Sequence, residues 1–255
     1  MNVPPFHWWR TVFYLIPAIS VYTIVLGTLS IGSSLVGGRG GFAHWCARMW
    51  SRLILATTGV RVTVRGLAHV PTTGAALYVS NHQSIYDIPI LFWNLPVDLR
   101  IIAKQSLGWF PFLGWHLGRT GHVLVDRRKP GADVFRQVSA LMKVGVSLLV
   151  FPEGTRSADG RVGKFKGGIF LLAIESGLPV VPVAVRKSRF VMRKGRLMTC
   201  PGDVGVEVFE PIPTAGLTRE DAKALSTRVQ AIVTAGVGDD VDAPGDVTAA
   251  RGARA

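Results

Sequence analysis

Acidic residues and cysteines are both scarce in this chain of 255 residues. Lys and Arg number 29 against 16 Asp and Glu, which gives a net charge of +13, and a basic excess of this size predicts an anionic partner. The two cysteines, Cys46 and Cys200, lie far apart and belong to no CxxC or Cys/His cluster. The sequence therefore predicts neither a disulfide framework nor a structural metal site, and we expect two buried free thiols.

Charged side chains are absent altogether from Thr11 to Gly38. The apolar run TVFYLIPAISVYTIVLGTLSI has the length of about 20 residues that a ~30 Å hydrocarbon layer requires, and it exceeds the roughly 7 to 15 residues of a secretory-signal core. A nucleic-acid-binding protein has no need of such a run, so the basic charge indicates a membrane instead. We expect residues 1–58 to form an N-terminal, membrane-associating helical segment, and we expect no nucleic acid among the partners.

The topology of this segment stays open at the level of sequence. Pro17 and Gly27 interrupt the run, so a helix broken near Pro17, a hairpin within one leaflet and a simple span are all compatible with it. Three arginines follow the run between residues 39 and 52, whereas only Arg10 precedes it closely. By the positive-inside tendency, the remaining chain is cytoplasmic, at the inner face of the cell membrane if the protein is bacterial.

A helix is expected next, in HWCARMWSRLILATTG. Trp45, Met49, Leu53 and Ile54 fall near one of its faces, and basic residues fall on another. A helix at the membrane interface and an ordinary core-packing helix both account for this pattern.

From Val60 onward, short apolar runs alternate with helical patterns. VRVTVR has the period of a strand with one wet face, and AALYVS, LRIIA, HVLVD, SLLVF, VVPVAV and VGVEVFEP are typical of further strands. An amphipathic helix is expected between HVLVD and SLLVF, and a further helix that Thr218 is able to cap is expected after VGVEVFEP. This alternation predicts an α/β fold over residues 59–235, with a mixed, largely parallel sheet flanked by helices. Residues 236–255 hold almost no bulky apolar side chain and are expected to form a disordered tail.

The stretch NHQSIYD directly follows the expected strand AALYVS and precedes an apolar segment opened by Pro89. His82 and Asp87 therefore lie at the end of a strand, where open α/β sheets place their sites, and we expect the two side chains to meet across the turn. A histidine held by a carboxylate is a general base, because the Asp fixes the ring tautomer and stabilises the imidazolium. For an isolated HxxxxD, a loop histidine beside a helix-capping Asp is the simpler alternative.

A second group of polar residues, FPEGTRS, follows the expected strand SLLV and falls on the same edge of the sheet. Gly154 permits close approach of the backbone, and Thr155 offers a hydroxyl. Arg156 offers a planar fork suited to phosphate, and Glu153 is able to hold a substrate hydroxyl or that arginine. An ordinary turn with a surface ion pair is the alternative.

Basic side chains also follow two other expected strands. Lys104 follows LRIIA, and Arg127 with two further basic residues follows HVLVD. This clustering predicts an anionic substrate group, most simply a phosphate, near His82, although a solvated basic face is preferred for the two residues after Arg127. The segment 186–196 carries six basic residues around an apolar centre, which suits either anionic lipid headgroups or an exposed hairpin.

Taken in order, these motifs resemble the glycerolipid acyltransferase family, and most closely its lysophosphatidic-acid acyltransferases. NHQSIYD is similar to the family's NHxxxxD block, GHVLVDR to its second block, FPEGTRS to its third and LPVVPVAV to its proline-centred fourth. FKGG also fits the family's usual pattern after the third block. HxxxxD alone is a weak signal, whereas the ordered set, between residues 60 and 213, is a strong one.

The resemblance implies a role for each matching residue. His82 is the expected base and Asp87 its partner. The expected substrate-binding residues are Lys104, Arg127, Glu153, Gly154, Thr155 and Arg156, of which the two arginines are expected to hold the acceptor's phosphate and Lys104 to assist them.

The implied reaction is attack by the sn-2 hydroxyl of 1-acyl-sn-glycerol 3-phosphate on an acyl-CoA or acyl-carrier-protein thioester, which gives phosphatidic acid for phospholipid biosynthesis. The thioester is a co-substrate, and no metal or other cofactor is expected. Another lysolipid or glycerol 3-phosphate as acceptor is the alternative within this class, and a non-catalytic basic membrane-binding protein is a more distant one. A phosphohydrolase is disfavoured, because the histidines form no metal-ligand cluster and no separate nucleophile motif is present.

Overall fold

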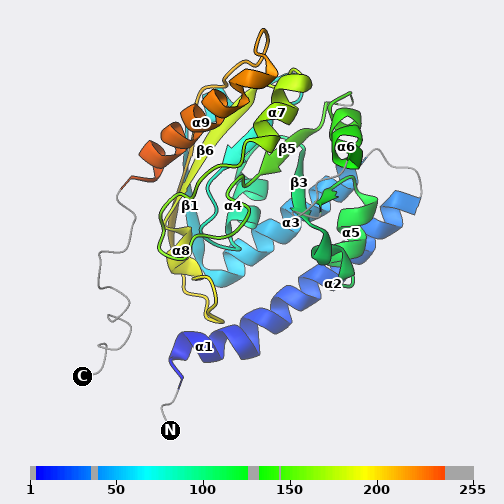
Figure 1. Ribbon diagram of the computed structural model, residues 1–255. Coiled ribbons are helices and arrows are strands. Elements are labelled where there is room, and N and C mark those ends of the chain that lie inside the picture. The colour runs from blue at the N-terminus through cyan, green and yellow to red at the C-terminus, as the bar shows by residue number, and fades with distance from the viewer. Residues whose placement is uncertain (1–3, 36–39, 126–131, 144, 239–255) are drawn as a thin grey trace.

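The computed structural model describes residues 4–35, 40–125, 132–143 and 145–238. Within these residues, seven strands form one sheet in the order β1-β7-β6-β2-β5-β3-β4 (Figure 1). The strands are β1 (Val60–Arg65), β2 (Leu77–Ser80), β3 (Leu99–Lys104), β4 (Val123–Val125), β5 (Ser147–Val150), β6 (Val180–Arg186) and β7 (Gly202–Val208). In this described part, β6 and β7 are antiparallel and the other neighbouring pairs are parallel. The expectation of an α/β fold with a mixed, largely parallel sheet is confirmed.

The burial of each strand follows from its sequence. The apolar runs of β2 and β5 are buried throughout, as strands covered on both faces should be. In the edge strand β1, Val62 and Val64 are half-buried while Arg61, Thr63 and Arg65 are exposed, so the predicted period of two is confirmed.

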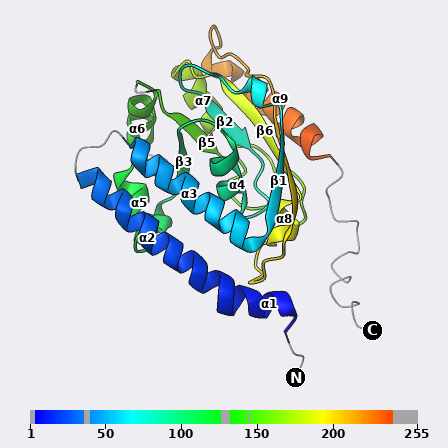
Figure 2. The same cartoon turned by 180° about the vertical axis from the view of Figure 1, so that it is seen from behind.

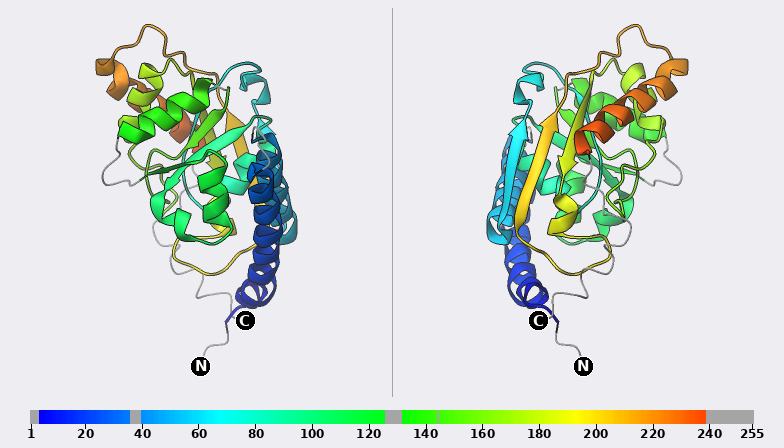
Figure 3. Two further views of the ribbon diagram at one scale, coloured as in Figure 1. Left: turned by 90° about the vertical axis from the view of Figure 1, so that its right-hand side faces the viewer. Right: turned by 90° about the vertical axis from the view of Figure 1, so that its left-hand side faces the viewer.

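Helices cover both faces of the sheet and divide the core in two. α3 (Gly41–Thr58), α4 (Asp87–Asn94) and α5 (Leu113–Arg119) pack on one face, whereas α6 (Ala132–Lys143), α7 (Gly168–Glu175) and α9 (Ala222–Val237) pack on the other (Figures 2 and 3). The alternation of side chains along β2 serves both layers, since Tyr78 joins the first core and Leu77 and Val79 join the second. The short helix α8 (Ser188–Val191) follows β6.

The last helix begins where the sequence predicts. Thr218 and Asp221 form a reciprocal capping box around the short 3₁₀ turn η4 (Arg219–Asp221) that leads into α9. α9 continues through Val237, two residues beyond the predicted end of the catalytic domain at residue 235. Residues 239–255, the greater part of the expected tail, lie outside the described residues.

The N-terminal apolar segment is one continuous helix. α1 (Phe6–Arg10), the π-helical turn η1 (Thr11–Leu15) and α2 (Ile16–Leu35) follow each other without a gap. The wider π turn directly precedes Pro17, where a proline ring would otherwise clash with the preceding turn of an α-helix, so neither the break near Pro17 nor a hairpin is found in these residues. Of the helices described, only this one, Phe6–Leu35 with mean hydropathy 2.0, is long and apolar enough to cross a membrane.

Polar contacts attach this helix to the rest of the protein along its length. Near its start, Thr11 Oγ1 accepts a hydrogen bond from the backbone N–H of Thr199 at 2.8 Å. Near its end, Ser34 Oγ accepts one from Arg119 Nε at 3.2 Å. The side turned away from the domain is apolar and exposed, and it includes Phe13, Tyr14, Val21, Ile24, Val25 and Leu29. The helix therefore lies along the α/β domain (Figure 2), and its exposed side chains on the other side form an apolar face.

Candidate active site

The loops that carry the expected site residues meet at the carboxyl edge of the sheet. β2, β5 and β3 are neighbouring parallel strands, so their carboxyl ends lie at one edge. His82 follows β2, Glu153 follows β5 and Lys104 is the last residue of β3. Arg127, which we expect beside them after β4, lies outside the described residues.

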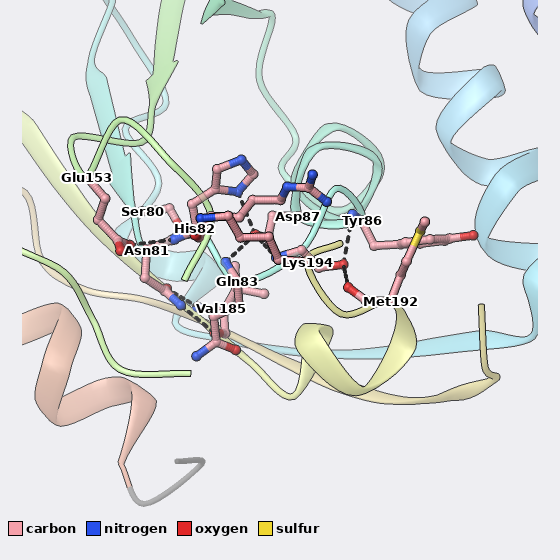
Figure 4. Close-up of polar contacts among 12 residues, drawn as sticks. Ser80, Asn81, His82, Gln83, Tyr86, Asp87, Glu153, Val185, Met192 and Lys194 are labelled. Carbon is pink, nitrogen blue, oxygen red and sulfur yellow. Dashed lines mark hydrogen bonds and ion pairs between the residues drawn. The ribbon is translucent and has the colours of Figure 1, made fainter. Parts of the chain in front are cut away.

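Asp87 is the first residue of α4 and is fully buried. Its Oδ2 lies 2.8 Å from His82 Nδ1 and accepts hydrogen bonds from the backbone N–H groups of Gln83 at 2.8 Å and Ser84 at 2.9 Å (Figure 4). Three donors around one carboxylate oxygen stabilise the negative charge and hold the loop tightly. The prediction that His82 and Asp87 meet across the turn is confirmed.

The contact with Asp87 determines the state of the His82 ring. A neutral imidazole that donates from Nδ1 to a carboxylate leaves Nε2 unprotonated and able to accept a proton. The ring stacks on that of Phe151, with centroids 4.2 Å apart, and the side chain is 13% exposed. The structure thus holds the imidazole of His82 in a fixed orientation with limited access to solvent.

Two further side chains fix the loop that bears His82. The amide of Asn81 exchanges two hydrogen bonds of 2.8 Å with the backbone of Val185 in β6. The carboxylate of Glu153 accepts the backbone N–H of His82 at 2.7 Å (Figure 4), and it accepts that of Gly163 at 2.9 Å. Burial raises the pKa of Glu153, and these two hydrogen bonds oppose that rise. Glu153 therefore connects the loops after β2 and β5, and its expected contact with substrate stays a prediction.

Two lysines that we did not expect at the site lie against the loop after β5. Gly154 has φ of +75°, and Lys166 Nζ lies 2.9 Å from the position that a Cβ would take there. Lys194 Nζ donates hydrogen bonds to Thr155 Oγ1 at 3.1 Å and to the backbone oxygen of Arg156 at 2.8 Å. These lysines belong to FKGG and to the basic segment 186–196, both of which stand out in the sequence. Neither motif indicates which of its basic residues contacts the loop.

A cavity of about 620 Å³ opens beside the His82–Asp87 pair. Most of its lining is apolar and comes from α2, α3, α4, β3 and α5, with Trp50, Ile88, Ile101, Leu107 and Leu113 among the contributing side chains. Among the expected site residues, those that line it are His82, Lys104, Gly154, Thr155 and Arg156. The structure therefore brings together every expected site residue that it describes, with Asp87 and Glu153 behind His82.

No set of three or more His, Cys, Asp or Glu side chains within the described ranges is arranged to hold a metal ion. A histidine oriented by a carboxylate, next to a mainly apolar cavity that Lys104 and Arg156 also line, is an arrangement that can perform acyl transfer.

The chain is similar to known acyltransferases. A family model described as "Acyltransferase" matches residues 61–186. The chain is 34% identical over 222 residues to the human 1-acyl-sn-glycerol-3-phosphate acyltransferase alpha, which covers 86% of this chain and 78% of the human protein. The protein therefore belongs to the acyltransferase family, and the resemblance seen in its motifs is confirmed.

Other relatives agree with this assignment. The mouse 1-acyl-sn-glycerol-3-phosphate acyltransferase alpha is 37% identical over 176 residues, which make up 68% of this chain and 62% of the mouse protein. The chain thus matches about three-fifths of the length of that relative. The crystal structure of the 1-acyl-sn-glycerophosphate (LPA) acyltransferase PlsC from Thermotoga maritima superimposes with a TM-score of 0.77 at 27% identity, over 89% of this chain and 92% of that one.

Proposed function

We propose that this protein transfers an acyl group from a CoA or acyl-carrier-protein thioester to the sn-2 hydroxyl of 1-acyl-sn-glycerol 3-phosphate, giving phosphatidic acid. The observation that carries the proposal is the His82–Asp87 pair beside an apolar cavity, with Lys104 and Arg156 also lining that cavity. The names of the human, mouse and Thermotoga maritima relatives support this choice of acceptor.

The proposed chemistry needs one base and no covalent enzyme intermediate. His82 Nε2 takes the proton of the acceptor hydroxyl as its oxygen attacks the thioester carbonyl, and Asp87 stabilises the imidazolium that forms. The tetrahedral intermediate then expels the thiolate, to which His82 returns the proton. The products are phosphatidic acid and free thiol, and His82 is neutral again.

The acceptor's phosphate is proposed to bind on the basic rim of the cavity. Arg156 offers two parallel donors and Lys104 a point charge, and both line the cavity near His82. Lys194, through its hydrogen bonds to the adjacent Thr155 and Arg156, adds a third positive charge to this rim. Arg127 remains a proposed phosphate ligand on the strength of its motif.

The acyl chain of the donor is proposed to occupy the cavity itself. Each buried methylene contributes about 0.8 kcal/mol, so a long chain gains much of its affinity from apolar walls of this kind. The acyl chain of the donor enters past His82, and its thioester carbonyl then lies beside this histidine.

We further propose that the N-terminal segment attaches the catalytic domain to one face of a membrane. Because polar contacts tie the helix to the domain near both of its ends, a perpendicular span would draw part of the α/β domain into the hydrocarbon layer. A helix lying in the interface instead places its free apolar side in one leaflet. On this proposal residues 1–58 serve attachment, residues 59–235 catalysis, and the catalytic domain is cytoplasmic.

The proposal is tested by product analysis. The detergent-solubilised protein is supplied with labelled acyl-CoA and, in parallel, with 1-acylglycerol 3-phosphate, glycerol 3-phosphate or 1-acylglycerophosphocholine. We expect labelled phosphatidic acid from the first acceptor at the highest kcat/KM. A higher kcat/KM with either other acceptor would replace the proposed substrate, and the absence of acyl transfer from both CoA and carrier-protein donors would contradict the function.

A further inference from the structure

One wall of the cavity carries two buried histidines that the proposed reaction does not use. His116 in α5 and His122 before β4 both line the cavity, and only 8% and 7% of their surface is exposed. Their ring centroids are 5.4 Å apart. Imidazoles in an otherwise apolar pocket need hydrogen-bond partners, because an unpaired buried polar group is unfavourable.

The tautomer of His122 follows from its backbone contact. Its Nδ1 lies 3.1 Å from the backbone nitrogen of Ile101, whose N–H can only donate. Burial lowers the pKa of His122 well below its ordinary value, so the ring is neutral and its proton is on Nε2. Among the residues that the structure describes, this Nε2–H has no hydrogen-bond acceptor.

His116, by contrast, has protein partners. Its Nδ1 lies 2.7 Å from Ser30 Oγ in α2, and its Nε2 lies 3.5 Å from Thr120 Oγ1. Burial, helped by the positive charge of Arg100, lowers the pKa of His116 to about 4. Two neutral rings therefore stand side by side in the cavity wall, and the one with an unused donor is His122.

This unused donor lies deep in the cavity relative to the base. Ile101 is paired with Leu149 in β5, and Leu149 is paired with Tyr78 in β2, so Ile101 and Tyr78 lie at one level of the sheet. β2 continues from Tyr78 to Ser80, and His82 follows in the loop at the carboxyl edge, so the two lie at most roughly 13 Å apart along the chain. An acyl chain held by its carbonyl beside His82 would reach His122 well away from the thioester.

We propose that His122 forms a subsite for an oxygen atom carried by the acyl chain, such as a hydroxyl or keto group, and that the enzyme prefers oxygenated acyl donors to unsubstituted donors of equal length. This inference rests on the proposed acyl transfer. A plain methylene chain packed against His122 leaves the Nε2–H unpaired, whereas an oxygen at the same depth accepts it. A site built to bind a polar group discriminates against the analogue that lacks it for this reason.

The test compares donors on the unaltered protein. Acyl-CoAs of one chain length, with a hydroxyl at successive positions or with none, are supplied with 1-acylglycerol 3-phosphate, and kcat/KM is measured for each. We expect at least one hydroxyl position to be favoured by roughly fivefold, the gain of one net neutral hydrogen bond. If every hydroxylated donor is used no better than the unsubstituted one, the inference is overturned and an ordered water is the partner of His122.

Two variants locate the effect. In His122→Phe the ratio of kcat/KM between the favoured hydroxylated donor and the unsubstituted donor should fall toward one. If that variant does not fold, His122→Asn, whose amide retains an acceptor for the N–H of Ile101, is measured in the same way and should shift the favoured position. His69→Leu is the control. The ring of His69 lies 2.9 Å from the backbone oxygen of Val208 and does not line the cavity, so this change should leave the ratio unchanged.

The outcomes separate this inference from the proposed function. Phosphatidic acid from the unsubstituted donor with no preference for oxygen overturns only the subsite. A preference for the same hydroxyl position that persists unchanged in the His122 variants likewise overturns it. Failure of every donor would overturn the acyl transfer and the subsite together.

Discussion

Replacing Asp87 by Asn tests how the buried carboxylate supports His82. The change keeps the size of the side chain, and a carbonyl oxygen is still able to accept the two backbone N–H groups of Gln83 and Ser84 that now bond to Oδ2. The variant should therefore fold. What it loses is the negative charge 2.8 Å from His82 Nδ1, which is needed when the ring takes a proton.

The size of the effect follows from that lost charge. Opposite charges about 4 Å apart attract by about 4 kcal/mol at an effective dielectric constant near 20, and each 1.4 kcal/mol is tenfold in rate. We expect kcat for phosphatidic acid formation to fall by roughly 10² to 10³, with a much smaller change in KM. The assay uses saturating 1-acylglycerol 3-phosphate and acyl-CoA, with folding checked by thermal denaturation.

A matched control separates this effect from a general loss of charge. Asp203 in β7 forms an exposed pair with Arg61 in the edge strand β1, so Asp203→Asn should leave kcat within about twofold, as surface substitutions usually do. If Asp87→Asn behaves like this control, the carboxylate does not assist the base and the reasoning is refuted.

Three further predictions concern the loop, the cavity and the response to acid. Glu153→Gln cannot accept both backbone N–H groups, so the free energy of unfolding should fall by about 1 to 3 kcal/mol and kcat should fall with it; an unchanged urea midpoint would count against the role of Glu153 between the loops. Gly27 lines the cavity, and a Cβ built on it would lie 3.2 Å from the Cβ of Phe112. Because a leucine side chain at this position takes up space in the cavity, Gly27→Leu should shift the preference among acyl-CoAs toward shorter chains. An unaltered chain-length profile would argue against binding of the acyl chain in this cavity. The pKa of His116 falls from 6.5 to about 4 on folding, so the stability that the neutral ring contributes is fully present above pH 6.5 and is lost as the pH falls toward 4. The free energy of unfolding should therefore decrease by roughly 3 kcal/mol over this range. Urea unfolding at a series of pH values measures this decrease, which should be smaller in His116→Gln.

The contact between His82 and Asp87 was predictable because its determinants are local. The motif directly follows a buried strand, and Pro89 favours the start of a helix at Asp87. These two boundaries leave one short turn in which the side chains face each other. The alternation in β1 and the start of a helix at Thr218 were predictable for the same reason, since each depends on neighbours within a few residues.

Contacts that depend on tertiary packing were not predictable in the same way. Glu153 bonds the backbone of His82, 71 positions away, and its motif shows only that a carboxylate is near the site. Lys194 reaches Arg156 from a segment 38 positions further on. The path of that segment depends on how β6 and β7 pair, which no single motif specifies.

The buried face of α3 and the continuity of the N-terminal helix could not be predicted from the local apolar pattern alone. The predicted face of α3 includes Trp45, yet Trp45 is 48% exposed while its neighbour Cys46 is buried. α3 packs against α2 on one side and against α4 and β1 on another, so its buried surface is determined by several neighbours rather than by one stripe. Pro17 likewise left a broken helix, a hairpin and a simple span open at the level of sequence, whereas the structure has a continuous helix with a π turn before Pro17.

The central claim is that His82 is the base of an acyl transfer onto 1-acylglycerol 3-phosphate. It is tested most directly by comparing phosphatidic acid formation by the parent protein and by His82→Ala, both folded and supplied with labelled acyl-CoA. A general base contributes about 10² to 10⁴ in rate, so the account predicts product from the parent and a loss of that order in the variant. Equal rates for the two proteins would contradict it.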